Sequence, residues 1–216
     1  MDSQNNLFDS LLPPPDLPDG MFYRQKALVG NEDALYAALS AILAVAPPAQ
    51  ARTRGGGLTS AAITNCGHFG WWSDAKGYRY QARRPDNGKP WPPIPNIFFD
   101  TVERVMSDTP WPDFKPDSCL INFYGAGAKM GLHQDRDEKD LSQPILTICL
   151  GDDAIFMVGG FSRTDKATSF VVSSGDVLIM GGASRMRFHG IRKVYSGTGS
   201  LENLSGRYSL TFRKAF

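Results

Sequence analysis

Short runs of β-branched, aromatic and aliphatic residues follow one another from about residue 118 to the C-terminus, and they restrict the folds open to this chain. Glycine-bearing turns separate many of the runs, as in an all-β sandwich or barrel. The expected strands are residues 119–124, 145–150, 154–158, 169–172, 176–180, 187–191 and 207–212. We therefore predict a mainly β fold.

Helical periodicity appears only in the N-terminal half. An apolar stripe predicts a helix over 31–43, with Asn31 at its N-cap, and a second stripe predicts a helix over 96–106. Residues 11–20 are rich in proline, so we expect residues 1–20 to form an extended arm. A length of 216 residues favours one domain, with room for an appended subdomain.

Composition excludes several classes of protein. No apolar run approaches the roughly 20 residues of a membrane span, and the acidic, polar start lacks the features of a signal peptide. We therefore expect a cytoplasmic protein without a membrane partner. Cys66, Cys119 and Cys149 are far apart and show no C-x-x-C spacing, which argues against a disulfide framework or a structural zinc site.

Positive charge is local, since the formal net charge is only +1. Residues 52–90 contain seven bases and two acids, among aromatic residues that include Trp71, Tyr78 and Tyr80. The bases are Arg52, Arg54, Lys76, Arg79, Arg83, Arg84 and Lys89. A solvated surface is the ordinary interpretation of such a cluster. Stacking surfaces beside cations are, however, what a single-stranded or flipped nucleotide requires.

A His-x-Asp pair, His133 and Asp135, follows the first expected strand. If this segment is extended, both side chains point to one side and can share a metal ion with a distant histidine, His189. Two histidines and one carboxylate on one face are typical of non-haem Fe(II) oxygenases. The spacing alone is also compatible with an ordinary surface histidine.

The C-terminal run alternates strictly. Arg207, Ser209, Thr211 and Arg213 share one face of a strand, and the residues between them are apolar or aromatic. An edge strand with a solvated polar face is one interpretation. The other is a dicarboxylate anchor, because arginine offers forked donors that match a carboxylate. Asn122 and Tyr124 alternate in the same way and could donate to the same ligand.

Several motifs together resemble the AlkB family of alkylation-repair dioxygenases. The resemblance covers roughly residues 50–216, with all motifs in the family's order. The motifs are Thr64-Asn65-Cys66-Gly67-His68, Gly77-Tyr78-x-Tyr80, Leu120-Ile121-Asn122-x-Tyr124, Leu132-His133-Gln134-Asp135-x-Asp137-Glu138, Gly181-Gly182-x-Ser184-Arg185, Phe188-His189-Gly190-Ile191 and Arg207-Tyr208-x-Leu210-Thr211-Phe212-Arg213.

The resemblance implies a double-stranded β-helix, or jelly roll, of the α+β class with flanking helices. Residues 116–216 would form its Fe(II)/2-oxoglutarate dioxygenase core, and residues 21–115 its helical support and a nucleotide-recognition lid. The implied Fe(II) ligands and catalytic residues are His133, Asp135 and His189. The implied 2-oxoglutarate ligands are Asn122, Tyr124, Arg207, Ser209 and Arg213. Ser209 stands where bacterial relatives commonly have asparagine, and which arginine takes which carboxylate is left open.

For the substrate, the resemblance implies alkylated DNA, single-stranded or with a flipped base, and RNA as a further candidate. The implied substrate contacts are Trp71, Tyr78, Asp137, Glu138, Arg163, Lys129 and Gln134, with Thr53 in the lid. An aromatic face and the Asp137 carboxylate would favour the cationic bases 1-methyladenine and 3-methylcytosine. For Asp137, Glu138 and Asp140 a solvated acidic turn is the alternative.

The implied reaction consumes O2 and 2-oxoglutarate and yields succinate, CO2, formaldehyde and the repaired base. We expect a monomer. Two other functions are weighed against this one. The first is a 2-oxoglutarate-dependent hydroxylase of a small molecule or protein side chain, which would need no Trp71 region. The second is a noncatalytic nucleic-acid or metal-binding module. The sequence leaves the choice of DNA or RNA and the range of lesions open.

Overall fold

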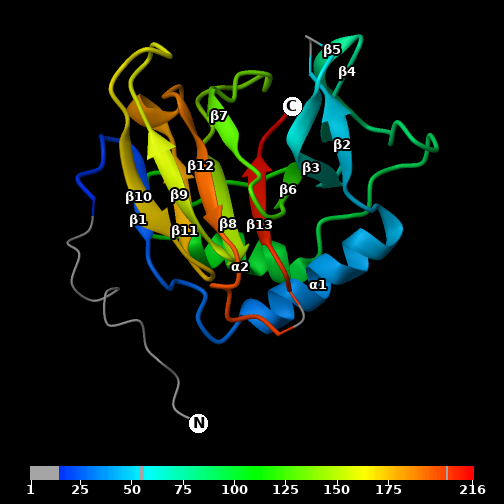
Figure 1. Ribbon diagram of the computed structural model, residues 1–216, viewed down its shortest axis with the longest axis horizontal. Coiled ribbons are helices and arrows are strands. Elements are labelled where there is room, and N and C mark those ends of the chain that lie inside the picture. Colours follow the sequence, from blue (N-terminus) through cyan, green and yellow to red (C-terminus); the bar gives the residue numbers. More distant parts are fainter. Residues whose placement is uncertain (1–14, 54–55, 203) are drawn as a thin grey trace.

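Two antiparallel sheets form the body of the protein (Figure 1). The computed structural model describes residues 15–53, 56–202 and 204–216. Most of the expected N-terminal arm, residues 1–14, lies outside the described residues, as does Arg54 of the basic segment.

The major sheet has the strand order β1-β11-β8-β13-β6-β3-β2. Its strands are β1 (Met21–Arg24), β2 (Ala49–Arg52), β3 (Leu58–Gly67), β6 (Ser118–Tyr124), β8 (Ile145–Gly151), β11 (Val177–Met180) and β13 (Arg207–Arg213). The minor sheet has the order β10-β9-β12-β7. It consists of β7 (Met130–His133), β9 (Asp153–Val158), β10 (Thr168–Val172) and β12 (His189–Tyr195). A separate hairpin pairs β4 (Gly70–Asp74) with β5 (Gly77–Gln81).

The predicted fold class is confirmed, and each expected strand is present within a few residues. The largest difference is in β12, which begins at His189 rather than at Arg187 and continues to Tyr195. Strands β1 to β5 and β7 were not among the expected strands. Some of their sequences, such as AQAR in β2 and MGLH in β7, have little β-propensity. Pairing with a neighbouring strand makes these segments extended.

Two helices cover the outer face of the major sheet (Figure 1). α2 (Asn96–Met106) has the predicted bounds, and α1 (Glu32–Val45) runs two residues beyond the predicted end. Asn31 occupies the N-cap position of α1, but its side chain makes no capping hydrogen bond. Leu35, Leu39 and Phe98 are fully buried in the core between these helices and the sheet.

β13 lies in the middle of the major sheet, between β6 and β8. Tyr208, Leu210 and Phe212 face the helices and belong to the main core cluster. All seven residues of the strand are buried, so the alternative of an edge strand with a solvated face is wrong. The polar face is turned inward instead, between the two sheets.

The core and the N-terminal region share one sheet. β1, β2 and β3 come from residues 21–115, yet they extend the sheet that contains β13 and β6. The β4-β5 hairpin, in contrast, pairs with neither sheet and lies next to β2 and β3, at the upper right of the view (Figure 1). In the described part of the chain, no helix is both long enough and apolar enough to cross a membrane.

Candidate metal and cosubstrate site

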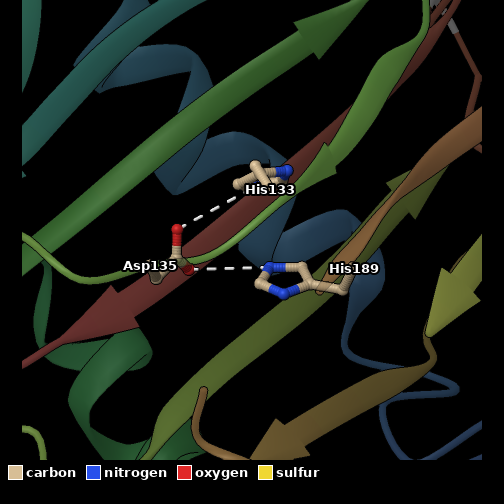
Figure 2. Close-up of side chains that lie close together, drawn as sticks. All are labelled: His133, Asp135 and His189. Carbon is tan, nitrogen blue, oxygen red and sulfur yellow. Dashed lines mark ion pairs between the residues drawn. The ribbon is translucent and has the colours of Figure 1, made fainter. Parts of the chain in front are cut away.

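Three potential metal ligands meet at one end of the space between the sheets (Figure 2). His133 ends β7, His189 begins β12, and the two residues are directly paired across the strands. Asp135 follows two residues after His133. Its Oδ1 and Oδ2 atoms lie 3.8 Å and 3.7 Å from the Nε2 atoms of His133 and His189. One ligand atom from each residue falls within 4.8 Å of the others, close enough for one ion to bridge them.

Backbone carbonyls orient both imidazoles. The Nδ1 atom of His133 lies 3.0 Å from the carbonyl of Gly131, and that of His189 lies 3.1 Å from the carbonyl of Arg187. Because a carbonyl only accepts, each Nδ1 carries the proton and donates it. The lone pair of each Nε2 is then free to bind a metal.

The electrostatics of the cluster also suit a cation. Burial alone would raise the pKa of Asp135, but Arg213, His189 and His133 outweigh it and hold that pKa well below its usual range. Arg213 donates from Nη2 to Asp135 Oδ2 at 2.7 Å. Burial, together with the neighbouring His133, lowers the pKa of His189 to about 4. A carboxylate beside a neutral imidazole is a donor set that fits a divalent ion such as Fe(II).

A cavity of about 130 Å³ opens beside the cluster and is lined by both sheets. β13 and β6 supply its polar wall, as their alternation predicted. That wall consists of Asn122, Tyr124, Arg207, Ser209, Thr211 and Arg213. The minor sheet contributes Phe156, whose ring stacks 6.0 Å from His189. Thus the expected metal and 2-oxoglutarate residues line a single space.

Two polar groups in this wall have atoms without a partner. Arg207 is 1% exposed and donates from Nη1 to the carbonyls of Asp152 and Val172, but its Nε has no acceptor among the described residues. The Oδ1 atom of the buried Asn122 is likewise unpaired there. Buried polar atoms rarely lack a hydrogen-bond partner, and a bound polar ligand is one way to supply it.

Tyr124 is available as a donor. It is 2% exposed, and its hydroxyl has only a weak contact with the sulfur of Met130 at 3.7 Å. Burial is the main cause that raises its pKa above the usual value, so the phenol keeps its proton. A protonated hydroxyl can donate to a carboxylate in the cavity.

The hairpin contributes one aromatic residue to the lining of this cavity, at what we call its mouth. Trp71, on β4, lines it and stacks on Tyr78 of β5 with ring centroids 5.5 Å apart. The indole Nε1 donates to Asp137 Oδ2 at 2.7 Å. Three expected substrate contacts are therefore together, on the hairpin and on the segment after the metal ligands.

Among the described residues, Trp71 is the one expected substrate contact that lines the cavity itself. The Glu138 carboxylate is buried and bound to Arg185. Gln134 donates to the carbonyl of Met186 at 2.6 Å, and Lys129 is exposed. Arg163 lies over the ring of Phe188, 5.4 Å from its centroid, on the loop between β9 and β10.

Sequence reasoning overlooked some residues that the structure places at the site. Arg185 and Tyr80 belong to motifs used for the resemblance, but neither was assigned to the metal or cosubstrate site. Phe156 was not singled out, although the alternation of Ala154, Phe156 and Val158 could have marked an inward face.

Comparisons with known proteins agree with this geometry. The model of the 2OG-Fe(II) oxygenase superfamily matches residues 20–213. The alpha-ketoglutarate-dependent dioxygenase AlkB of Escherichia coli strain K12 is 45% identical over 169 residues, which are 78% of each chain. The AlkB homolog of Caulobacter vibrioides strain NA1000 / CB15N is 44% identical over 187 residues, 87% of this chain and 83% of the relative.

A solved structure, that of OsALKBH1, is similar as well, with a TM-score of 0.75 at 30% identity over 92% of this chain and 99% of that one. More distant relatives include a DNA N(6)-methyladenine demethylase of Arabidopsis thaliana, matched over 65% of this chain and 36% of its own. A tRNA demethylase of Schizosaccharomyces pombe is matched over 61% of this chain and 42% of its own. Each of the two is 35% identical to this chain.

The fold and the ligand set define an Fe(II)- and 2-oxoglutarate-dependent dioxygenase. Within that class, the chain belongs to the AlkB family, as the sequence motifs predicted.

Proposed function

We propose that the protein removes N-alkyl groups from nucleic acid bases, with 1-methyladenine and 3-methylcytosine in DNA as its main substrates and RNA as a further one. The observation on which the proposal rests is the His133, Asp135 and His189 cluster beside a cavity with an arginine-lined end and an aromatic mouth. The demethylase names of the more distant relatives support a nucleic acid substrate. We further propose that it acts as a cytoplasmic monomer.

His133, Asp135 and His189 are proposed to hold Fe(II). When bound, the iron couples the oxidative decarboxylation of 2-oxoglutarate to hydroxylation of the N-methyl group, which then leaves as formaldehyde. The chain's own residues bind and orient the reactants and keep bulk water out.

The two arginines are proposed to bind opposite ends of 2-oxoglutarate. Arg213 is already paired with the metal ligand Asp135, so it lies nearest the end that chelates the metal. Arg207 lies on the same face at the other end of β13, lines the same cavity and has a donor to spare. It therefore suits the distal carboxylate, with Ser209 and Tyr124 beside it.

Trp71 is proposed to stack on the extruded base. A cationic methylated base gains from the aromatic face and from Asp137, whereas a neutral undamaged base gains less. In this structure the Trp71 indole donates to Asp137, so a bound base would have to share or replace that contact. Tyr78, 45% exposed, is placed to meet the flanking nucleotides.

Incubation with Fe(II), 2-oxoglutarate and O2 tests the proposal on oligonucleotides that carry 1-methyladenine or 3-methylcytosine. We expect the loss of one methyl group by mass spectrometry, with matching amounts of succinate and formaldehyde. Succinate formed without any demethylation of DNA or RNA would instead favour a hydroxylase of small molecules or proteins. A Trp71→Ala variant that still repairs oligonucleotides normally would favour the same alternative.

A further inference from the structure

Glu138 stands at the centre of a buried polar network next to the metal cluster. Its side chain is 2% exposed, and that of its ion-pair partner Arg185 is 3% exposed. Glu138 Oε2 accepts from Arg185 Nη2 at 2.9 Å, and Oε1 accepts from the Tyr80 hydroxyl at 2.5 Å. The Nε atom of Arg213 lies 3.4 Å from Oε1. Both carboxylate oxygens are therefore occupied by side chains of the protein itself.

The same network holds Asp135 from two directions. Arg185 donates from Nη1 to the backbone carbonyl of Asp135 at 2.6 Å and from Nε to the carbonyl of Gln143 at 2.9 Å. Arg213 donates from Nε and Nη2 to Asp135 Oδ2 at 3.2 Å and 2.7 Å. Glu138 thus contacts both arginines that orient the backbone and the side chain of this metal ligand.

We propose that Glu138 is a positioning residue, which fixes Asp135 for metal binding through Arg185 and Arg213 and ties the β4-β5 hairpin to the metal site through Tyr80. The inference rests on the metal role proposed for Asp135. It replaces the expected role of Glu138 as a direct contact to the damaged base. The hairpin supplies Trp71 and Tyr78, so one carboxylate links the metal ligand to the element proposed to receive the base.

Two other carboxylates on the same segment, Asp137 and Asp140, lie in different surroundings from Glu138. Asp137 is exposed and accepts from Trp71 at the mouth of the cavity, where a base can reach it. Asp140 is exposed, and among the described residues its side-chain hydrogen bonds go to Ser142 and Gln143, with only a weaker charge interaction with Arg185. Only Glu138, among these three, is buried beneath the metal ligands. Outer contacts of this kind typically change metal affinity by about 10- to 100-fold when they are removed.

Two measurements on the complete protein test the proposal, and neither requires turnover. The first is the dissociation constant for Co(II), used as a redox-stable probe of the metal site under anaerobic conditions. The second is the rate of limited proteolysis within the β4-β5 hairpin. The variants are Glu138→Gln and Tyr80→Phe, with Asp140→Asn as the matched control on the same segment. Thermal unfolding in the presence of a chelator establishes that each variant is folded.

We expect Glu138→Gln to weaken Co(II) binding about 10- to 100-fold and to speed cleavage of the hairpin. Tyr80→Phe should speed cleavage while weakening Co(II) binding less, because Arg185 and Arg213 keep their carboxylate. Asp140→Asn should change neither. If folded Glu138→Gln binds Co(II) like the unmodified protein and only its KM for a methylated oligonucleotide rises, Glu138 contacts substrate and the proposal is wrong. A different outcome would separate the two proposals. If Glu138→Gln binds Co(II) more weakly but the unmodified protein demethylates no oligonucleotide, the positioning role of Glu138 stands and the proposed function is refuted.

Discussion

Replacement of Arg207 by methionine should separate cosubstrate binding from folding. Arg207 is buried and donates to two backbone carbonyls, and its Nε has no acceptor among the described residues. Methionine fills similar space without a donor. The thermal midpoint of unfolding is measured with Mn(II), in the presence and absence of 2-oxoglutarate. The quantity compared is the difference between the two midpoints of the same variant, so any change in that variant's intrinsic stability cancels.

The size of the effect follows from the hydrogen bonds that are lost. A hydrogen bond to a charged group contributes about 1.5–3 kcal/mol, which corresponds to roughly a 10- to 100-fold weaker affinity. At a 2-oxoglutarate concentration about 100 times the dissociation constant of the unmodified protein, binding stabilises the fold by about 2.7 kcal/mol. In a protein of 216 residues, that amounts to about 5–10 °C. A 100-fold weaker variant retains about 0.4 kcal/mol, or roughly 1 °C.

The matched control is Arg192→Met. Arg192 is exposed on β12, so its loss removes the same charge without touching the cavity. We expect it to keep the full shift with 2-oxoglutarate. A full shift in Arg207→Met, equal to that of the control, would show that the distal carboxylate binds elsewhere.

Three other variants test separate parts of the structure. Trp71→Ala should lose most demethylation of methylated oligonucleotides and keep the 2-oxoglutarate-dependent thermal shift, since the indole lines only the mouth of the cavity; an equal loss of both would contradict its assignment to the base. Leu39→Ala should lower the free energy of unfolding by about 2–5 kcal/mol, as measured by urea denaturation, because Leu39 is fully buried under α1; a change near zero would mean that α1 contributes little to the core. Burial and the bond to Asp176 raise the pKa of Tyr23 far above its ordinary value of 10.0, so unfolding releases a proton at alkaline pH and the stabilisation is lost as the pH rises beyond 10. Tyr23→Phe should therefore show a shallower alkaline fall in unfolding free energy, and an unchanged slope would exclude Tyr23 as its source.

The sequence pattern was sufficient to predict those elements in which apolar and polar residues recur with a clear period. In β13 the period of two separates Leu210 and Phe212 from Arg207 and Arg213, and the structure places the two sets on opposite faces. α2 has a similarly clear pattern and its predicted bounds are confirmed. Strands such as β2 and β7 lack this signal, because their extended shape comes from hydrogen bonds to a partner strand, β3 for β2 and β12 for β7.

The site was harder to predict wherever a role depends on partners remote in sequence. Asp137 and Glu138 are adjacent, and the sequence gives no reason to treat them differently. In the fold, one carboxylate lies at the cavity mouth and the other is buried against Arg185, 47 residues further along the chain. The pairing of β12 with β7, which sets His189 opposite His133, and the hydrogen bond from Arg185 to the Asp135 carbonyl bring these segments together.

Charge balance explains why the polar face of β13 suits an anionic ligand better than a structural role. Around the described cavity and its network, Arg185, Arg207 and Arg213 are buried, and they face the buried carboxylates of Asp135 and Glu138. Arg185 pairs with Glu138 and Arg213 with Asp135, so Arg207 is the arginine of this set without a carboxylate. A buried charge without a partner is costly to the folded state. The distal carboxylate of 2-oxoglutarate, bound as proposed, would give Arg207 the ionic partner that it lacks, while Arg185 and Arg213 keep theirs.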